Sequence, residues 1–160
     1  MHISIVAVGT RMPQWIQQGC ADYLQRLPRE WSVQLTEVAP ARLGKQAPRA
    51  SILRAEGERI RAQLRPNSAS ALRHVALDVK GKAWSTAELA RQLQVWQLDG
   101  RDVAILIGGP EGLDESLLGQ AEQRWSLSPL TFPHPLVRVI LLEQLYRAWS
   151  ILQNHPYHRE

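Results

Sequence analysis

Apolar residues occur along this chain in short continuous runs that are separated by longer segments of helical periodicity. A short apolar run rich in β-branched residues indicates a strand buried on both faces of a sheet, and residues 2–8 and 103–107 have this pattern. An alternating pattern predicts a strand over 32–38, and further strands are predicted over 74–79 and, as a fifth strand or loop, over 125–132.

The segments between these runs carry the signals that begin and end helices. Ser85 and Glu88 have the spacing of a capping box, in which each side chain binds the backbone N–H of the other residue. Pro135 occupies the first position of a long apolar helix, where a proline is well tolerated. The predicted helices span residues 13–27, 50–64, 86–98, 114–123 and 135–152.

Strands that alternate with helices predict an α/β fold with a mostly parallel sheet flanked by helices. Two polar segments interrupt this alternation of strands and helices. Lys80-Gly81-Lys82 predicts a turn after the third strand, and Pro66-Asn67-Ser68 ends the second helix. The 160 residues contain no repeat and no linker, so residues 1–160 are expected to form a single domain.

The strand over 103–107 is followed directly by the segment Gly108-Gly109-Pro110-Glu111-Gly112. Glycine adopts backbone angles that other residues avoid, and it lets a ligand approach the main chain. In open parallel sheets, ligands bind just beyond the carboxyl ends of the strands. This segment therefore predicts a small-molecule site, and a tight turn without further function is the alternative.

The composition is that of an ordinary globular protein, with 44% hydrophobic and 21% charged residues. Cys20 is the only cysteine, which excludes an intrachain disulfide and a cysteine-cluster metal site and suits a reducing cytoplasm. The sequence has no metal-ligand spacing, no signal-peptide flank and no apolar run long enough to span a bilayer. We therefore expect a cytoplasmic protein without a membrane or metal partner.

The formal net charge is +4, and arginine supplies most of the positive charge because Lys45, Lys80 and Lys82 are the only lysines. Guanidinium groups bind phosphate oxygens bidentately and stack on bases, so this balance favours a nucleic-acid partner. Together with Arg42 and Arg49, the lysines are candidate phosphate contacts. Solubilising surface charge is the alternative for each of them.

The predicted helix over 135–152 is apolar around most of its circumference. Such a helix needs more cover than a small monomer supplies, which indicates a homodimer, with a central core helix as the alternative. Arg138 lies opposite the polar side of this helix and in its first turn, where the helix dipole disfavours a cation. It is therefore expected to have a specific partner, which is either a phosphate or substrate carbonyl or an ion-pair partner at an interface.

The chain ends in Asn154-His155-Pro156-Tyr157-His158-Arg159-Glu160, which gathers two imidazoles, a phenol and a guanidinium. Histidine exchanges protons near neutral pH, and tyrosine stacks on nucleic-acid bases. This cluster favours an active-site tail over a solvated chain end.

Several motifs together resemble one known family. They are Gly-Thr-Arg-Met-Pro at 9–13, Leu-Ile-Gly-Gly-Pro-Glu-Gly at 106–112, Leu-Thr-Phe-Pro-His at 130–134, and Tyr-Arg-Ala-Trp at 146–149 with the Tyr157-His158 tail. This combination resembles the ribosomal RNA large subunit methyltransferase H family of the SPOUT superfamily, and the resemblance covers essentially the whole chain.

The resemblance implies an α/β sheet whose carboxyl-terminal part forms a trefoil knot, a homodimer, and S-adenosylmethionine as the cofactor. It implies an enzyme that methylates N3 of a pseudouridine in 23S ribosomal RNA, with the assembled ribosome as partner. Carried over by position, the implied cofactor-binding residues are Leu77, Gly108, Leu127, Ser128, Pro129, Leu130, Thr131 and Phe132.

The ring nitrogen N3 carries a proton and becomes a good nucleophile only when that proton is lost. A base whose pKa lies near the working pH suits this step. His158 is the first candidate, with Tyr157 or His155 as aids, and Arg138 is assigned to anchoring RNA or polarising the ring.

Two other functions remain open from the residues. An RNA- or ribosome-binding module without catalysis would explain the basic charge but not the glycine-rich strand end. An enzyme that uses the glycine segment for nucleotide phosphates is disfavoured, because the chain has neither a Gly-x-x-x-x-Gly-Lys-Ser/Thr nor a Gly-x-Gly-x-x-Gly sequence.

Overall fold

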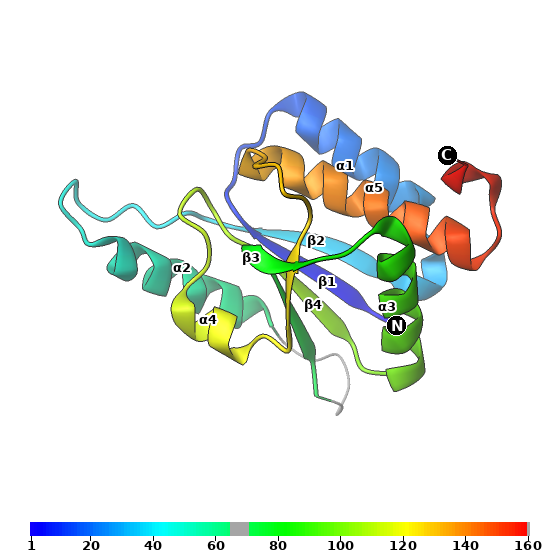
Figure 1. Ribbon diagram of the computed structural model, residues 1–160. Helices are drawn as coiled ribbons and strands as arrows, with labels where there is room; N and C mark the ends of the chain where they lie inside the picture. The colour runs from blue at the N-terminus through cyan, green and yellow to red at the C-terminus, as the bar shows by residue number, and fades with distance from the viewer. Residues whose placement is uncertain (65–70, 160) are drawn as a thin grey trace.

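Figure 1 shows the computed structural model, which describes residues 1–64 and 71–159. Five strands form one sheet in the order β2-β1-β4-β3-β5, and the paired neighbours in it run parallel. This architecture confirms the predicted α/β class with a parallel sheet flanked by helices. The strands are β1 (Ile3–Val8), β2 (Val33–Val38), β3 (Arg73–Ala83), β4 (Val103–Ile107) and β5 (Gln123–Ser126).

Helices cover both faces of the sheet, with α1, α3 and α5 on one face and α2 and α4 on the other (Figure 1). The predicted end of the second helix at Pro66-Asn67-Ser68 lies outside the described residues. The helices are α1 (Gln14–Arg26), α2 (Arg49–Gln63), α3 (Thr86–Asp99), α4 (Glu115–Gln120) and α5 (His134–Leu152), with the short 3₁₀ helices η1 (Arg29–Trp31) and η2 (Pro156–His158).

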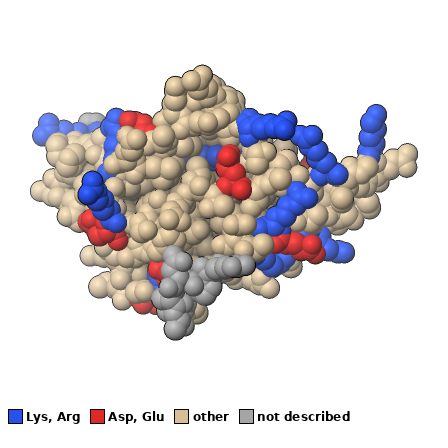
Figure 2. Space-filling view, turned by 180° about the vertical axis from the view of Figure 1, so that it is seen from behind, with Lys and Arg blue, Asp and Glu red and all other residues tan. Residues whose placement is uncertain are grey.

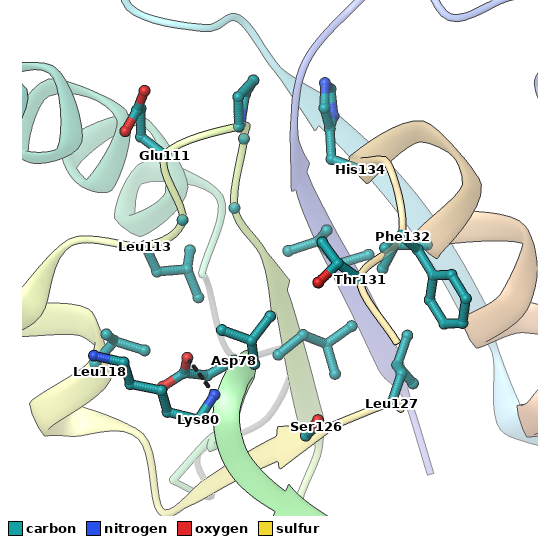
Figure 3. A pocket seen from close by; sticks show the side chains of 18 of the residues that line it. Asp78, Lys80, Glu111, Leu113, Leu118, Ser126, Leu127, Thr131, Phe132 and His134 are labelled. Carbon is teal, nitrogen blue, oxygen red and sulfur yellow. Dashed lines mark hydrogen bonds between the residues drawn. The ribbon is translucent and has the colours of Figure 1, made fainter. Parts of the chain in front are cut away.

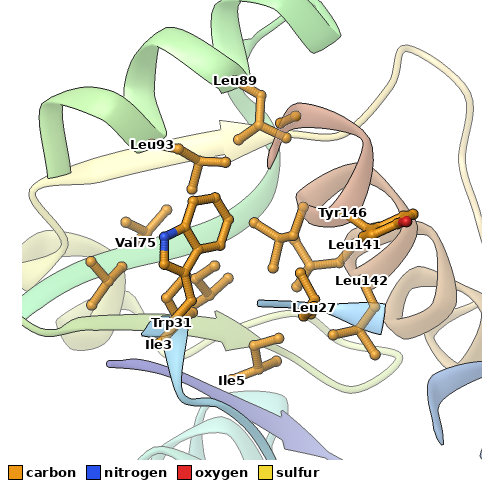
Figure 4. Packing of buried hydrophobic residues seen from close by; sticks show 14 of the residues in the cluster. Ile3, Ile5, Leu27, Trp31, Val75, Leu89, Leu93, Leu141, Leu142 and Tyr146 are labelled. Carbon is orange, nitrogen blue, oxygen red and sulfur yellow. The ribbon is translucent and has the colours of Figure 1, made fainter. Parts of the chain in front are cut away.

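The central strand β4 takes part in both hydrophobic cores. All of its residues are buried, and alternate side chains point to the two helical layers. Figure 4 shows the larger core, in which Trp31, Leu93 and Leu141 come from different segments and meet against the sheet. Each buried aliphatic side chain contributes about 1.5–3 kcal/mol to stability. A strand that is apolar on both faces is therefore most stable in the middle of the sheet, where helices cover both of its faces.

The capping box predicted at the start of α3 is confirmed. The Glu88 N–H donates to Ser85 Oγ at 3.1 Å, and the Ser85 N–H donates to the Glu88 carboxylate at 2.7 Å. These hydrogen bonds lower the pKa of Glu88. The helix ends at Asp99, within a residue of the predicted end, and Gly100 caps it with a left-handed backbone with φ of 75°.

The turn predicted at Lys80-Gly81-Lys82 is wrong, because this segment lies inside β3. Strand β3 pairs with β5 on both sides of an irregularity, so that Leu77 and Lys82 both pair with Trp125. The intervening residues bulge out of the ladder. Polar residues around a glycine suggest a turn locally, but here the strand resumes at Lys82, which pairs with a strand that follows much later in the chain.

Gly81 leaves no room for a larger residue, and this predicts the effect of a substitution. A Cβ atom at this position would lie 2.6 Å from the backbone carbon of Arg124. We expect Gly81→Ala to lower the free energy of unfolding by about 1–3 kcal/mol, as measured by urea denaturation.

Gly119→Ala is the matched control, because a Cβ there meets nothing within 4 Å and the residue lies in α4. That change is expected to leave stability unchanged or to raise it by about 0.5–1 kcal/mol. Equal stability of the Gly81→Ala and wild-type proteins would contradict the close pairing of β3 with β5.

Candidate active site

A cavity of about 1090 Å³ opens at the carboxyl ends of β4 and β5, beside the bulge in β3 (Figure 3). Cavities that hold small molecules commonly measure about 300–1,000 Å³, and this edge of a parallel sheet is where ligands usually bind. The glycine-rich segment that follows β4 therefore lines a cavity of suitable size. The main lining segments are residues 77–80, 107–113, 124–128 and 130–134.

The segment Gly108–Gly112 folds back on itself at the end of β4. The Gly112 N–H donates to the Gly109 carbonyl at 3.0 Å, and Gly112 has a φ of +87°. A Cβ on Gly108 would lie only 2.3 Å from the Gly112 carbonyl oxygen. The tight fold therefore requires glycine at 108 and leaves main-chain atoms on the cavity wall.

Helix α2 holds the outer side of this glycine segment. The Arg49 guanidinium donates to the Glu111 carbonyl oxygen at 2.6 Å, and its Nε lies 3.0 Å from the Glu111 carboxylate. Both side chains are well exposed, so solvent screening keeps the ion pair weak. Arg49 and Lys80 are the two predicted phosphate contacts that line the cavity, whereas Arg42, Lys45 and Lys82 do not.

The segment after β5 forms the opposite wall. Ser128 Oγ accepts the Leu130 N–H at 2.9 Å, and Ser126 Oγ donates to the Ser128 carbonyl at 3.1 Å. Leu130 is 70% exposed and lies on the rim. Seven of the eight cofactor-binding residues implied by the resemblance line the cavity, and Pro129 does not: the seven are Leu77, Gly108, Leu127, Ser128, Leu130, Thr131 and Phe132.

Arg138 does not line the cavity but is 1% exposed and directly follows Val137, which does line it. Its guanidinium pairs with the Glu37 carboxylate and donates to the carbonyl oxygens of Val8 and Gly9, at 3.2 and 2.9 Å. The specific partner expected from the sequence is therefore an acidic residue of the same chain. Direct contact of Arg138 with RNA stays a prediction, and the geometry supports an indirect role.

His134 was not selected from the sequence, although it begins α5 and lines the cavity across from the glycine segment (Figure 3). A Cβ on Gly9 would meet His134 Cε1 at 3.2 Å and Arg138 Nη2 at 3.1 Å, so the two side chains converge over this glycine. Burial and the nearby Arg138 charge lower the pKa of His134. Both effects favour the neutral form of the imidazole over the charged one.

The carboxyl-terminal tail packs against the second half of α5, from Glu143 onwards. The ring centroid of Tyr157 lies 4.5 Å from that of Tyr146, and its hydroxyl is 3.2 Å from the Tyr23 hydroxyl. The same hydroxyl donates to the Glu143 carboxylate at 3.2 Å, and Arg147 lies over the ring. Burial, followed by these contacts, raises the pKa of Tyr157.

Tyr157 and His158 are therefore distant from the cavity of their own chain. Helix α5 has 19 residues, so its two ends are separated by about 27 Å at 1.5 Å per residue. His134 lies at one end and the tail at the other (Figure 1). The structure does not bring the predicted proton acceptor to the predicted cofactor site within a single chain.

Comparison with known proteins identifies the family. The ribosomal RNA large subunit methyltransferase H of Chromohalobacter salexigens is 54% identical over 159 residues, which are 99% of this chain and 100% of that protein. Residues 1–158 match the family described as "Predicted SPOUT methyltransferase". This chain belongs to the SPOUT methyltransferase family. A solved structure, a probable methylase family protein from Haemophilus influenzae Rd KW20, shares the fold of this SPOUT methyltransferase with a TM-score of 0.56 at 13% identity, covering 99% of this chain and 70% of that one.

Basic side chains of the SPOUT methyltransferase gather towards one end of its rear face (Figure 2). Seen from the other side in Figure 1, this end is formed by α2 and the loop that precedes it. Arg42, Lys45 and Arg49 are exposed there. Part of the charge that suggested a nucleic-acid partner thus lies on the same side of the molecule as Arg49, which lines the cavity.

Two features are absent from residues 1–64 and 71–159. No group of histidine, cysteine, aspartate and glutamate side chains in these ranges is arranged to hold a metal ion. No helix in the same ranges is long and apolar enough to cross a membrane.

The lowered pKa of His134 predicts a dependence of stability on pH. The ordinary value is 6.5, and the folded-state value lies below it, so the unfolded chain binds a proton that the folded chain disfavours. The stability that the neutral His134 side chain contributes is fully present above pH 6.5. It is lost as the pH falls towards the folded-state pKa, because the unfolded chain then gains a proton more readily than the folded chain. Urea denaturation from pH 8 to 5 should show a smaller acid loss for His134→Gln than for the wild type. Parallel curves for the two proteins would contradict the lowered pKa.

Proposed function

We propose that this SPOUT methyltransferase uses S-adenosylmethionine to methylate N3 of a pseudouridine in 23S ribosomal RNA, acting on the assembled ribosome in the cytoplasm. The observation that supports this most strongly is the cavity with a glycine-lined wall, in a chain that matches a ribosomal RNA methyltransferase over its full length. We also propose that residues 1–160 form one domain and that the segment after β5 is threaded as a trefoil knot.

The residues of the cavity fit the proposed cofactor. Leu77, Ile107 and Leu113 provide apolar surface for a purine ring, and the glycine segment exposes main-chain donors and acceptors. Asp78 lies on the same wall and supplies a carboxylate for hydroxyl groups or positive charge. When bound, S-adenosylmethionine supplies a methyl group made electrophilic by a sulfonium.

The protein is proposed to be a homodimer in which each tail completes the cavity of the partner. The separation of tail and cavity along α5 supports this arrangement, because one chain alone cannot join them. Apolar side chains of α5 such as Val139 and Ile140 are only half-buried, and Trp15 of α1 is 60% exposed. A second copy of the chain would cover such surface.

In this arrangement His158 accepts the proton of N3, and Tyr157 supports the tail through its contacts with α5. The Nδ1 atom of His158 is buried and has no hydrogen-bond partner among the described residues, so the imidazole keeps capacity for a further contact. Arg138 acts on the site from below, through the elements that it connects. The gain from holding the ring nitrogen and the methyl carbon in line is about 7–11 kcal/mol.

The RNA is proposed to contact the basic residues Arg42, Lys45, Arg49, Lys80 and Lys82. Phosphate contacts release counterions, so the affinity should fall steeply with salt concentration. A chain of this size has little surface for reading sequence, and the shape of the ribosome is expected to supply part of the specificity.

Replacing Gly108 tests the cofactor site. The Cβ of Gly108→Ala would collide with the Gly112 carbonyl, and we expect calorimetry to show at least about tenfold weaker binding of S-adenosylmethionine. Wild type and Gly119→Ala should bind alike. Labelled cofactor and ribosomes then identify the modified nucleotide. If the folded wild type gives no binding heat and no methylated RNA, a binding module without catalysis is supported instead.

Mixing two inactive variants tests the shared active site. Gly108→Ala damages the cavity and His158→Ala the tail, so each homodimer should be inactive. Half of the exchanged dimers are mixed, and each has one site with an intact cavity and an intact partner tail, so about a quarter of the wild-type rate should return. Activity that stays absent in mixtures with proven subunit exchange would contradict catalysis by the partner's tail.

A further inference from the structure

One polar side chain on the cavity wall has no part in the chemistry proposed so far. His134 begins α5 and faces the cavity from the side opposite the glycine segment (Figure 3). The tail histidine lies at the other end of the same helix, so His134 is the imidazole that each chain contributes to its own cavity.

The immediate surroundings of His134 determine which of its nitrogens carries the proton. Nδ1 is closed off from solvent and has no hydrogen-bond partner among residues 1–64 and 71–159. A proton on Nδ1 would be a buried donor without an acceptor, which costs about 1–3 kcal/mol. The guanidinium of Arg138 converges with the ring over Gly9, and its positive charge favours a lone pair over an N–H at this buried nitrogen. The neutral imidazole therefore carries its proton on Nε2.

The same surroundings make a second proton unfavourable. Arg138 is buried and is held by Glu37 and by two carbonyl oxygens, so its charge cannot move away from the imidazole. His134 also lies in the first turn of a 19-residue helix, where the dipole disfavours positive charge and favours an anion. A group in this position is a poor proton acceptor, but it is a suitable neutral hydrogen-bond donor, a division of roles known from other enzymes.

The acceptor ring of the proposed reaction needs such a donor. Loss of the N3 proton leaves a negative charge that the flanking carbonyl oxygens of the ring share. Fixed donors aimed at developing charge lower the barrier because they need no reorganisation during the reaction. No bond to His134 itself forms or breaks in this role.

We propose that His134 is a catalytic residue whose Nε2–H donates a hydrogen bond to a ring oxygen of the methyl-accepting base, and that Arg138 is the positioning residue that keeps this imidazole neutral. This inference rests on the proposed function and adds a division of labour to it. The histidine of the partner's tail takes the proton, and the histidine of the chain's own cavity stabilises the charge that remains.

The decisive experiment compares His134→Ala and His134→Gln with the wild type under saturating S-adenosylmethionine and ribosomes. Loss of one such donor lowers the rate by about 10²–10³-fold, and we expect a fall of this size in kcat for His134→Ala. His134→Gln should recover part of the rate, because its amide N–H can donate. His2→Gln is the matched control, since His2 lies at the other end of β1, near Ser32, and should leave the rate unchanged.

Three further measurements separate this role from a structural or proton-accepting one. The affinity for S-adenosylmethionine should stay within about threefold of the wild type in both variants. The pH–rate profile of His134→Gln should rise and fall at the same pH values as that of the wild type, with a lower rate throughout. The ¹⁵N spectrum of histidine-labelled protein should show the His134 proton on Nε2.

Each contrary result would overturn the proposal. A wild-type rate for His134→Ala removes the donor role, and a loss confined to cofactor affinity makes the residue part of the cofactor site. A missing pH limb in His134→Gln makes it the base, and a proton on Nδ1 refutes the tautomer. Failure of the proposed function gives a different result, because the wild type itself would then neither bind the cofactor nor methylate ribosomes. The ¹⁵N spectrum would still show which nitrogen of His134 carries the proton.

Discussion

The buried guanidinium of Arg138 joins three elements that come from distant parts of the chain. Its backbone belongs to the second turn of α5, while its side chain binds Glu37 in β2 and the carbonyl oxygens of Val8 and Gly9 at the end of β1. A charge so deeply buried is tolerated only with such partners. The contact therefore requires α5 to begin beside the carboxyl edge of the sheet, and this places His134 on the cavity wall.

The cavity itself is formed where the backbone leaves its regular ladder at neighbouring strands. Strand β4 ends in a glycine segment that folds back on itself, and β3 bulges between Leu77 and Lys82 before it pairs with β5 again. Regular strands would close this edge with side chains. The two irregularities instead leave main-chain atoms and a few polar groups, such as Asp78, around a space of molecular size.

The length of α5 has a functional consequence that neither end of the helix reveals alone. Its first turn belongs to the cavity, and its second half carries the stacked rings of Tyr146 and Trp149, where Tyr146 packs against Tyr157 of the tail. A rigid helix between the two keeps them apart within one chain. The chemistry proposed above then needs a second copy of the chain, and this separation is the reason for proposing a homodimer.

Local signals in the sequence were sufficient for the fold class and the place of the cavity. The buried run of β4, the capping box at Ser85 and the glycine segment each depend on residues close together in the chain, which is why they could be predicted. The resemblance to a known family, rather than any periodicity, supplied the cofactor residues around it. The turn expected at Lys80-Gly81-Lys82 failed because pairing with β5 overrides local turn preference.

The tertiary structure decided which charged and titratable groups meet. The sequence indicated that Arg138 has a partner, but Glu37 lies 101 positions away and no local pattern connects them. His134 stood within a quoted motif without any sign of a role, and the tail seemed to belong beside the glycine segment. Secondary-structure propensity and the periodicity of apolar residues depend on near neighbours along the chain. The environment of a buried charge depends instead on packing between remote segments, which local sequence patterns do not reveal.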